Sequence, residues 1–68
     1  MTKQQIKNII NAKKSALSAK GIAAFSQVDA DSADLRNIEQ ACWEMEEAGE
    51  LVAFDRREEN QGLFFAAA

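Results

Sequence analysis

The stretch from Asp31 to Glu50 constrains the fold most, because it carries the signals for both ends of one long helix. Asp31 can cap a helix start, and Asp34 follows three residues later as in a capping box. Gly49 stands where a left-handed residue ends a helix at little cost. Apolar residues recur between these ends at spacings of three and four, typical of an amphipathic helix. We predict a helix over 32–48 whose apolar face carries Leu35, Ile38, Cys42 and Met45.

The residues after Gly49 predict a β-hairpin. Segments 51–56 and 62–66 are rich in strand-forming residues, and the polar stretch between them contains Asn60 and Gly62, where the chain can reverse. In the first strand, alternation puts Val52 and Phe54 on one face.

The second strand carries three consecutive large apolar residues, Leu63, Phe64 and Phe65. Alternation cannot bury all three against one core. Either Phe64 or the pair Leu63 and Phe65 is therefore exposed, which would suit a dimer or partner contact.

The first part of the chain predicts two shorter helices. Thr2 with Gln5 forms a capping-box pattern that opens a helix over 2–14. Ser18 can cap a second helix over 18–26. The competing interpretation is one continuous helix from Thr2 to Ala19, because neither proline nor glycine interrupts this segment. A turn at 27–31 follows, with Val28 as its apolar plug.

One core should collect the large apolar side chains. We expect Leu35, Ile38 and Met45 to be nearly fully buried, with Ile6, Ile10, Ile22, Phe25 and Phe54 on the same cluster.

Composition excludes several functional classes. The 68 residues make one domain at most and include no histidine and a single cysteine, so we expect no metal site, cofactor or internal disulfide. Cys42 has no candidate base, no glycine-rich phosphate loop is present, and we expect no enzyme. We expect Cys42 to be a buried small apolar residue. No segment is apolar enough for a membrane span and no signal peptide is evident, so we expect a cytoplasmic protein.

Charge is distributed unevenly along the chain. The net charge is −3, yet residues 1–20 carry five lysines and no acid, while residues 21–68 carry three arginines against eleven acids. The two parts therefore have charges of +5 and −8, an asymmetry that marks either a binding face or an ordinary solvated helix surface.

The order of predicted elements and three segments resemble winged helix-turn-helix domains. The segments are LSAKGIAAF (17–25), QVD (27–29) and MEEAGELV (45–52), which are similar to the second helix, the turn, and the passage from recognition helix to wing. The resemblance implies an α+β fold in which three helices precede a hairpin wing. Gly21 departs from it, because a good helix former is usual there.

The resemblance also implies a DNA-binding surface. Exposed residues of the third helix would enter the major groove and the wing would meet the backbone. An arginine suits guanine and an amide suits adenine. The implied DNA contacts are Ala33, Arg36, Asn37 and Gln40 on the helix, Arg56 and Arg57 on the wing, and Lys20. On this interpretation the protein is a bacterial or phage transcription regulator that binds duplex DNA as a homodimer.

Acidic residues oppose that interpretation. Asp29, Asp31 and Asp34 lie where such a domain approaches phosphates, and they would repel a duplex. Domains of this fold also bind proteins, so the alternative is a protein-interaction module with no DNA binding. Trp43 and Phe64 are the candidate partner contacts; Trp43 either covers the rim of the core or is an exposed contact residue.

Overall fold

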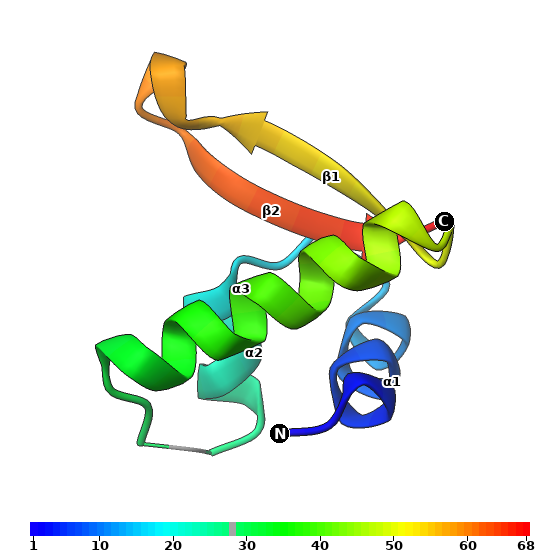
Figure 1. The fold of residues 1–68 in the computed structure, drawn as a ribbon, viewed down its shortest axis with the longest axis vertical. Helices are drawn as coiled ribbons and strands as arrows, with labels where there is room; N and C mark the ends of the chain where they lie inside the picture. The colour runs from blue at the N-terminus through cyan, green and yellow to red at the C-terminus, as the bar shows by residue number, and fades with distance from the viewer. Residues whose placement is uncertain (28) are drawn as a thin grey trace.

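The computed structural model describes residues 1–27 and 29–68, in which three helices precede a two-stranded antiparallel sheet (Figure 1). This α+β architecture confirms the predicted order of elements. The helices are α1 (Lys3–Lys13), α2 (Ala19–Phe25) and α3 (Ser32–Glu47). The strands are β1 (Leu51–Arg56) and β2 (Gly62–Ala67), joined through a short 3₁₀ turn, η1 (Arg57–Glu59).

Capping residues set the start of α1. The Thr2 hydroxyl accepts the main-chain N–H of Gln5 at 3.1 Å, and the Gln5 side chain accepts the N–H of Thr2 at 2.8 Å. Lys14 adopts a left-handed conformation with φ 54°, which ends the helix. Ser18 then caps α2 through the N–H of Gly21 at 3.0 Å. The alternative of one continuous helix to Ala19 is therefore wrong.

The long helix α3 has the ends that its sequence predicts. Asp31 accepts the N–H of Asp34 at 2.8 Å, and Asp34 accepts the N–H of Asp31 at 3.2 Å. Gly49 follows the helix with φ +79°, a conformation that costs glycine little. Both helix ends are thus fixed by local chemistry.

The hairpin reverses through Asn60 and Gly62, which have φ 59° and 91°. Its register places Phe54 opposite Phe64 and Ala53 opposite Phe65. β2 continues to Ala67, and the N–H of Ala68 donates to the carbonyl of Glu50 at 3.3 Å. Main-chain pairing therefore extends past the predicted strand, 62–66, to the last residue.

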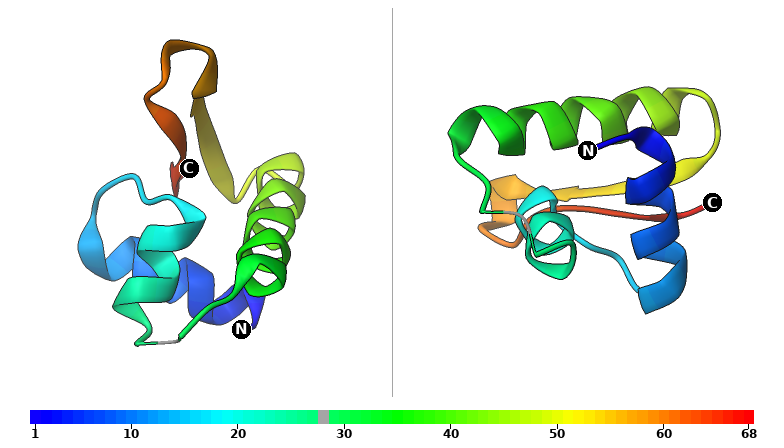
Figure 2. Two further views of the ribbon diagram at one scale, coloured as in Figure 1. Left: turned by 90° about the vertical axis from the view of Figure 1, so that its left-hand side faces the viewer. Right: turned by 90° about the horizontal axis from the view of Figure 1, so that it is seen from below.

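β2 also contacts the connector between α1 and α2. The N–H of Leu17 donates to the carbonyl of Phe65, and the N–H of Phe65 donates to the carbonyl of Leu17, both at 2.8 Å. Phe65 therefore has β1 on one side and Leu17 on the other. Both views in Figure 2 accordingly show α2 on the β2 side of the hairpin and α3 on the β1 side.

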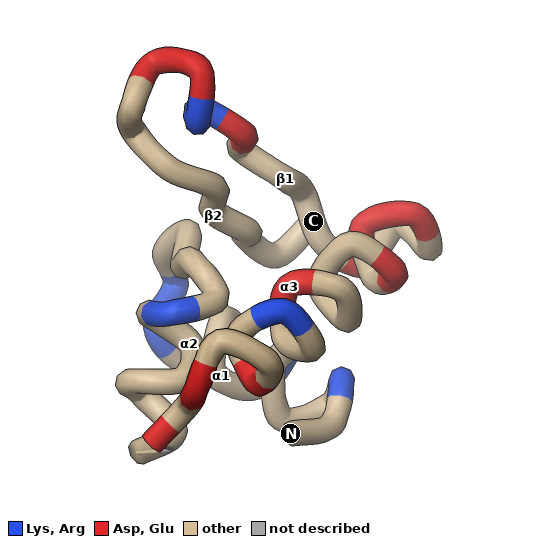
Figure 3. Tube along the Cα trace, turned by 60° about the vertical axis from the view of Figure 1, so that its left-hand side comes forward, with Lys and Arg blue, Asp and Glu red and all other residues tan. Residues whose placement is uncertain are grey.

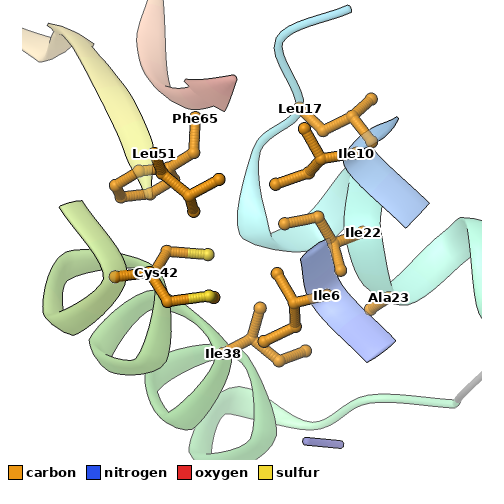
Figure 4. Close-up of a cluster of buried hydrophobic side chains, with 10 residues drawn as sticks. Ile6, Ile10, Leu17, Ile22, Ala23, Ile38, Cys42, Leu51 and Phe65 are labelled. Atoms are coloured by element: carbon orange, nitrogen blue, oxygen red, sulfur yellow. The ribbon is translucent and has the colours of Figure 1, made fainter. Parts of the chain in front are cut away.

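One cluster of apolar side chains lies between the helices and the base of the hairpin (Figure 4). Every helix and both strands contribute to it. Its buried members are Ile6, Ile10, Leu17, Ile22, Ala23, Ile38, Cys42, Met45, Leu51 and Phe65. The predictions for Ile6, Ile10, Ile22, Ile38, Cys42 and Met45 are confirmed.

The predicted burial of two residues, Phe25 and Phe54, is wrong. Phe25 is 49% exposed at the end of α2, where the Lys13 ammonium lies 4.2 Å from its ring centroid. Phe54 is 43% exposed, because Leu51 and Ala53 turn toward the core and Phe54 points from the other face of the strand. Leu35 packs against the core but is only half-buried. The prediction for Val28 lies outside the described residues.

Candidate interaction surface

The outer side of α3 presents three of the predicted contact residues. Arg36, Asn37 and Gln40 are all exposed there, as is Ala33. The Gln40 amide donates to Glu44 at 3.4 Å, one turn further along. The fold thus brings the predicted helix residues together on one accessible surface.

Trp43 joins this surface to the hairpin. Its ring is half-buried and meets the ring of Phe65 edge to face, with centroids 5.2 Å apart and an interplanar angle of 87°. Aromatic pairs favour this geometry because the positive ring edge meets the negative ring face. Trp43 therefore covers the rim of the core against β2, the first of its two predicted roles.

Arg57 is held by carboxylates. Its Nε donates to Asp55 Oδ1 at 2.9 Å and its Nη2 donates to Asp55 Oδ2 at 2.7 Å. These bonds lower the pKa of Asp55 to about 2 and raise that of Arg57. Glu39 of α3 lies 3.8 Å from Arg57 Nη1, so a second acid also faces this guanidinium across the space between helix and hairpin.

Three other cations are paired with carboxylates. The ion pairs are Lys3 with Glu44 at 2.7 Å, Lys7 with Glu50 at 2.9 Å, and Arg56 with Glu59 at 3.5 Å. The hydrogen bond from Lys3 lowers the pKa of Glu44. Figure 3 shows one basic position among several acidic ones on α3, and basic positions next to acidic ones at the hairpin turn.

Lys20 and Arg36, two predicted DNA contacts, lie on different sides of the hairpin. Among the described residues, Lys13, Lys14, Lys20 and Arg36 have no carboxylate within ion-pair distance. Lys20 is exposed on α2, which lies on the β2 side of the hairpin, whereas Arg36 is on α3 at the β1 side (Figure 2).

We call the surface formed by α3 and the hairpin turn the α3–hairpin face. Its members are Arg36, Glu39, Gln40, Trp43 and Glu47 of α3 with Asp55 and Arg57. Residues 31–59, which include it, carry ten acids and three arginines, a charge of −7. The face itself carries three acids and two arginines, a charge of −1, around one half-buried tryptophan.

The face of the hairpin that points away from the core carries a group of apolar side chains. Phe65 is fully buried and Leu63 packs against the core, so Phe64 is the residue of that trio that points outward. Phe64 is half-buried beside Phe54, and Val52 on the same face is 43% exposed.

A hollow between α1 and α3 is lined by few side chains that could take part in catalysis. Among the described residues that line it, Asp34 is the one acidic or basic side chain. It therefore lacks the paired acid and base of general acid–base catalysis. The described residues contain no group of His, Cys, Asp and Glu arranged to hold a metal ion, and none of their helices is long and apolar enough to cross a membrane.

Sequence reasoning did not single out Glu39, although it opposes Arg57 in the structure. A signal was present, because Glu39 precedes Trp43 by four residues and residues four apart share a helix face.

Comparison with models of known families, with curated proteins and with solved structures gives no match.

Proposed function

We propose that this chain is a winged-helix-type protein-interaction domain whose α3–hairpin face binds a basic protein segment. One observation carries the proposal: Arg57, a predicted phosphate contact, is already bound by Asp55 and faced by Glu39. A DNA phosphate would have to compete with two carboxylates for that guanidinium.

The wider charge distribution supports the same conclusion. Affinity for duplex DNA comes largely from Lys and Arg neutralising phosphates. Residues 31–59 have a charge of −7 and the α3–hairpin face has a charge of −1, so this side of the molecule does not supply the net positive charge that a duplex requires. A lysine- or arginine-rich protein segment would instead be attracted, and Trp43 offers it an aromatic surface for apolar or cation–π contact.

DNA binding remains the second candidate, because Arg36, Asn37 and Gln40 are exposed together on α3. These side chains can read guanine and adenine edges. The sequence resemblance assigns them that role in a regulator of transcription.

A peptide selection tests the leading proposal. Random twelve-residue peptides displayed on phage are selected on the immobilised protein and then tested on a Glu39→Gln, Glu47→Gln variant. We expect enriched peptides to combine Lys or Arg with an apolar residue and to lose binding to that variant. A matched control, Glu58→Gln with Glu59→Gln, removes acids from the hairpin turn and should leave binding nearly unchanged.

A DNA titration provides the opposing result. Random 20-base-pair duplex is titrated at several salt concentrations and followed by fluorescence anisotropy. We expect binding weaker than the 10⁻⁴–10⁻⁶ M usual for non-specific DNA binding at physiological salt. Tighter binding that weakens on Arg36→Ala would overturn the proposal in favour of DNA recognition.

A further inference from the structure

The free edge of β1 has hydrogen-bonding groups that point away from the sheet. Phe65 exchanges both of its main-chain hydrogen bonds with Leu17, and Phe65 lies opposite Ala53 in the β1–β2 register. In an antiparallel pair, a residue whose partner bonds elsewhere also points its own groups away. The N–H and C=O of Ala53 therefore point outward, and the same alternation applies to Leu51 and Asp55.

The part of this edge nearest the hairpin turn lies beyond the helices, whereas α3 flanks the start of β1 (Figure 2). The sheet of the described residues has two strands, and no third strand pairs with β1. Figures 1 and 2 show the hairpin projecting beyond the helices, with its turn farthest from them. An open edge of this kind is a template for pairing with another strand.

Alternate residues from Glu50 to Arg56 are complementary to the same residues read in the opposite direction, although the Glu50 carboxylate also pairs with Lys7 of α1 within the monomer. In chain order they are Glu50, Val52, Phe54 and Arg56, an acid, two apolar residues and a base. Antiparallel pairing of two copies about Ala53 places Glu50 opposite Arg56 of the second copy and Val52 opposite Phe54 of the second copy. The sequence thus supplies charge pairs at both ends and apolar pairs between them.

The alternative registers fit less well. A shift by one residue would place side chains that point away from the core directly opposite side chains that point toward it. Directly opposite residues of an antiparallel pair point to the same face of the sheet, so this register is excluded. Pairing about Phe54 keeps the faces matched but puts Glu50 opposite Glu58 of the second copy, and like charges directly opposite are destabilising. Ala53 is therefore the favoured centre.

We propose that two copies of this chain pair through their β1 edges, antiparallel about Ala53, into one four-stranded sheet. The proposal is independent of what the α3–hairpin face binds. Outward N–H and C=O groups of Leu51, Ala53 and Asp55 meet those of the second copy. The exposed Val52 and Phe54 of one copy become neighbours of Phe54 and Val52 of the other, which shields apolar surface from water.

The contact is small, so the dimer should be weak. Stable interfaces bury about 1,200–2,000 Å² in total, and a single strand edge buries less. We expect a dissociation constant between about 10 μM and 1 mM.

Charge reversal tests the register. Sedimentation equilibrium of wild type is compared with Glu50→Lys, Arg56→Glu and the double variant. Each single reversal creates two like-charge pairs and should weaken the dimer by about five- to thirty-fold. The double reversal restores opposite charges and should recover wild-type association. Glu50 and Arg56 also pair with Lys7 and Glu59 within the monomer, so the thermal midpoint of each variant is measured in parallel.

Ala53→Pro tests the edge directly. It removes an N–H that points outward, so it should abolish dimerisation while leaving the bonds between β1 and β2 in place. Fluorescence of Trp43 reports whether the variant is folded; if it is unfolded, the charge-reversal series decides alone. A wild type that is monomeric at 1 mM, or a folded Ala53→Pro that still forms the dimer, would overturn the proposal.

Discussion

The edge-to-face pair of Trp43 and Phe65 should contribute a measurable coupling to stability. Phe65 is fully buried, and truncating a buried phenylalanine to alanine costs about 3–5 kcal/mol. A chain of this length has a free energy of unfolding of roughly 3–10 kcal/mol, so that change risks unfolding it outright. Phe65→Leu is the sharper perturbation, because it keeps an apolar side chain in place and removes the ring.

The expected magnitude has two parts. An apolar swap of similar size usually costs less than about 1.5 kcal/mol. Loss of the aromatic pair adds about 0.5–1.5 kcal/mol beyond the lost burial. Phe65→Leu should therefore destabilise the fold by about 1–3 kcal/mol. With a urea dependence near 1 kcal/mol per molar, the unfolding midpoint should fall by about 1–3 M.

A double-mutant cycle isolates the pair. Urea unfolding of wild type, Phe65→Leu, Trp43→Leu and the double variant is followed by far-UV circular dichroism. Trp43 is the single tryptophan and the chain has no tyrosine, so its fluorescence gives an independent transition for wild type and Phe65→Leu. The coupling should be about 0.5–1.5 kcal/mol. A coupling below about 0.3 kcal/mol would mean that the two rings do not interact as the structure indicates.

Three further predictions concern acid stability, thiol reactivity and helix capping. The pKa of Asp55 is lowered to about 2, so its ion pair stabilises the fold above the unfolded pKa of about 3.9 and is lost as the pH falls toward 2. Asp55→Asn should therefore flatten the decline of the thermal midpoint between these two pH values, and an unchanged decline would contradict this. Burial raises the pKa of Cys42 to about 11, so a thiol reagent at pH 8 should label native protein far more slowly than urea-unfolded protein, and equal rates would refute burial. Asp31→Ala should lower the free energy of unfolding by about 0.5–2 kcal/mol and Asp31→Asn by much less, as measured by urea unfolding; equal losses would argue against a capping role.

Helix and strand boundaries were predictable because the signals that set them are local. Thr2, Ser18 and Asp31 each bond to a main-chain N–H three residues away. Gly49 and Gly62 have the positive φ that their positions suggested. Such signals act within one turn of chain, so they can be read from sequence without knowledge of the tertiary fold.

Which face of β1 is buried against the core could not be predicted in the same way. Alternation correctly paired Val52 with Phe54 on one face, but the choice of which face is buried depends on where α3 and β2 lie. Phe54 was expected inside, yet Leu51 and Ala53 take the inward side. Phe25 was misplaced for a related reason, since the end of a short helix extends past the core.

The charge balance of the candidate surface also required the fold. Sequence alone showed an uneven distribution and identified Arg57 as a possible phosphate contact. It did not show that Glu39, eighteen positions earlier, faces the same guanidinium, because that approach depends on how the hairpin stands over α3. The charge balance of this surface therefore depends on contacts between residues that are far apart in the sequence.

The bridge between Leu17 and Phe65 has a consequence for the folding kinetics. It joins residues 48 positions apart, so the chain must close a long loop before this part of the core can form. Contacts of large sequence separation slow folding, because loop-closure entropy is lost before the contact energy is gained. The three helices can form their capped ends early, but the step that commits the chain should be the return of β2 to the α1–α2 connector. The refolding rate should therefore respond more to changes at Leu17 and Phe65 than to changes at the helix caps.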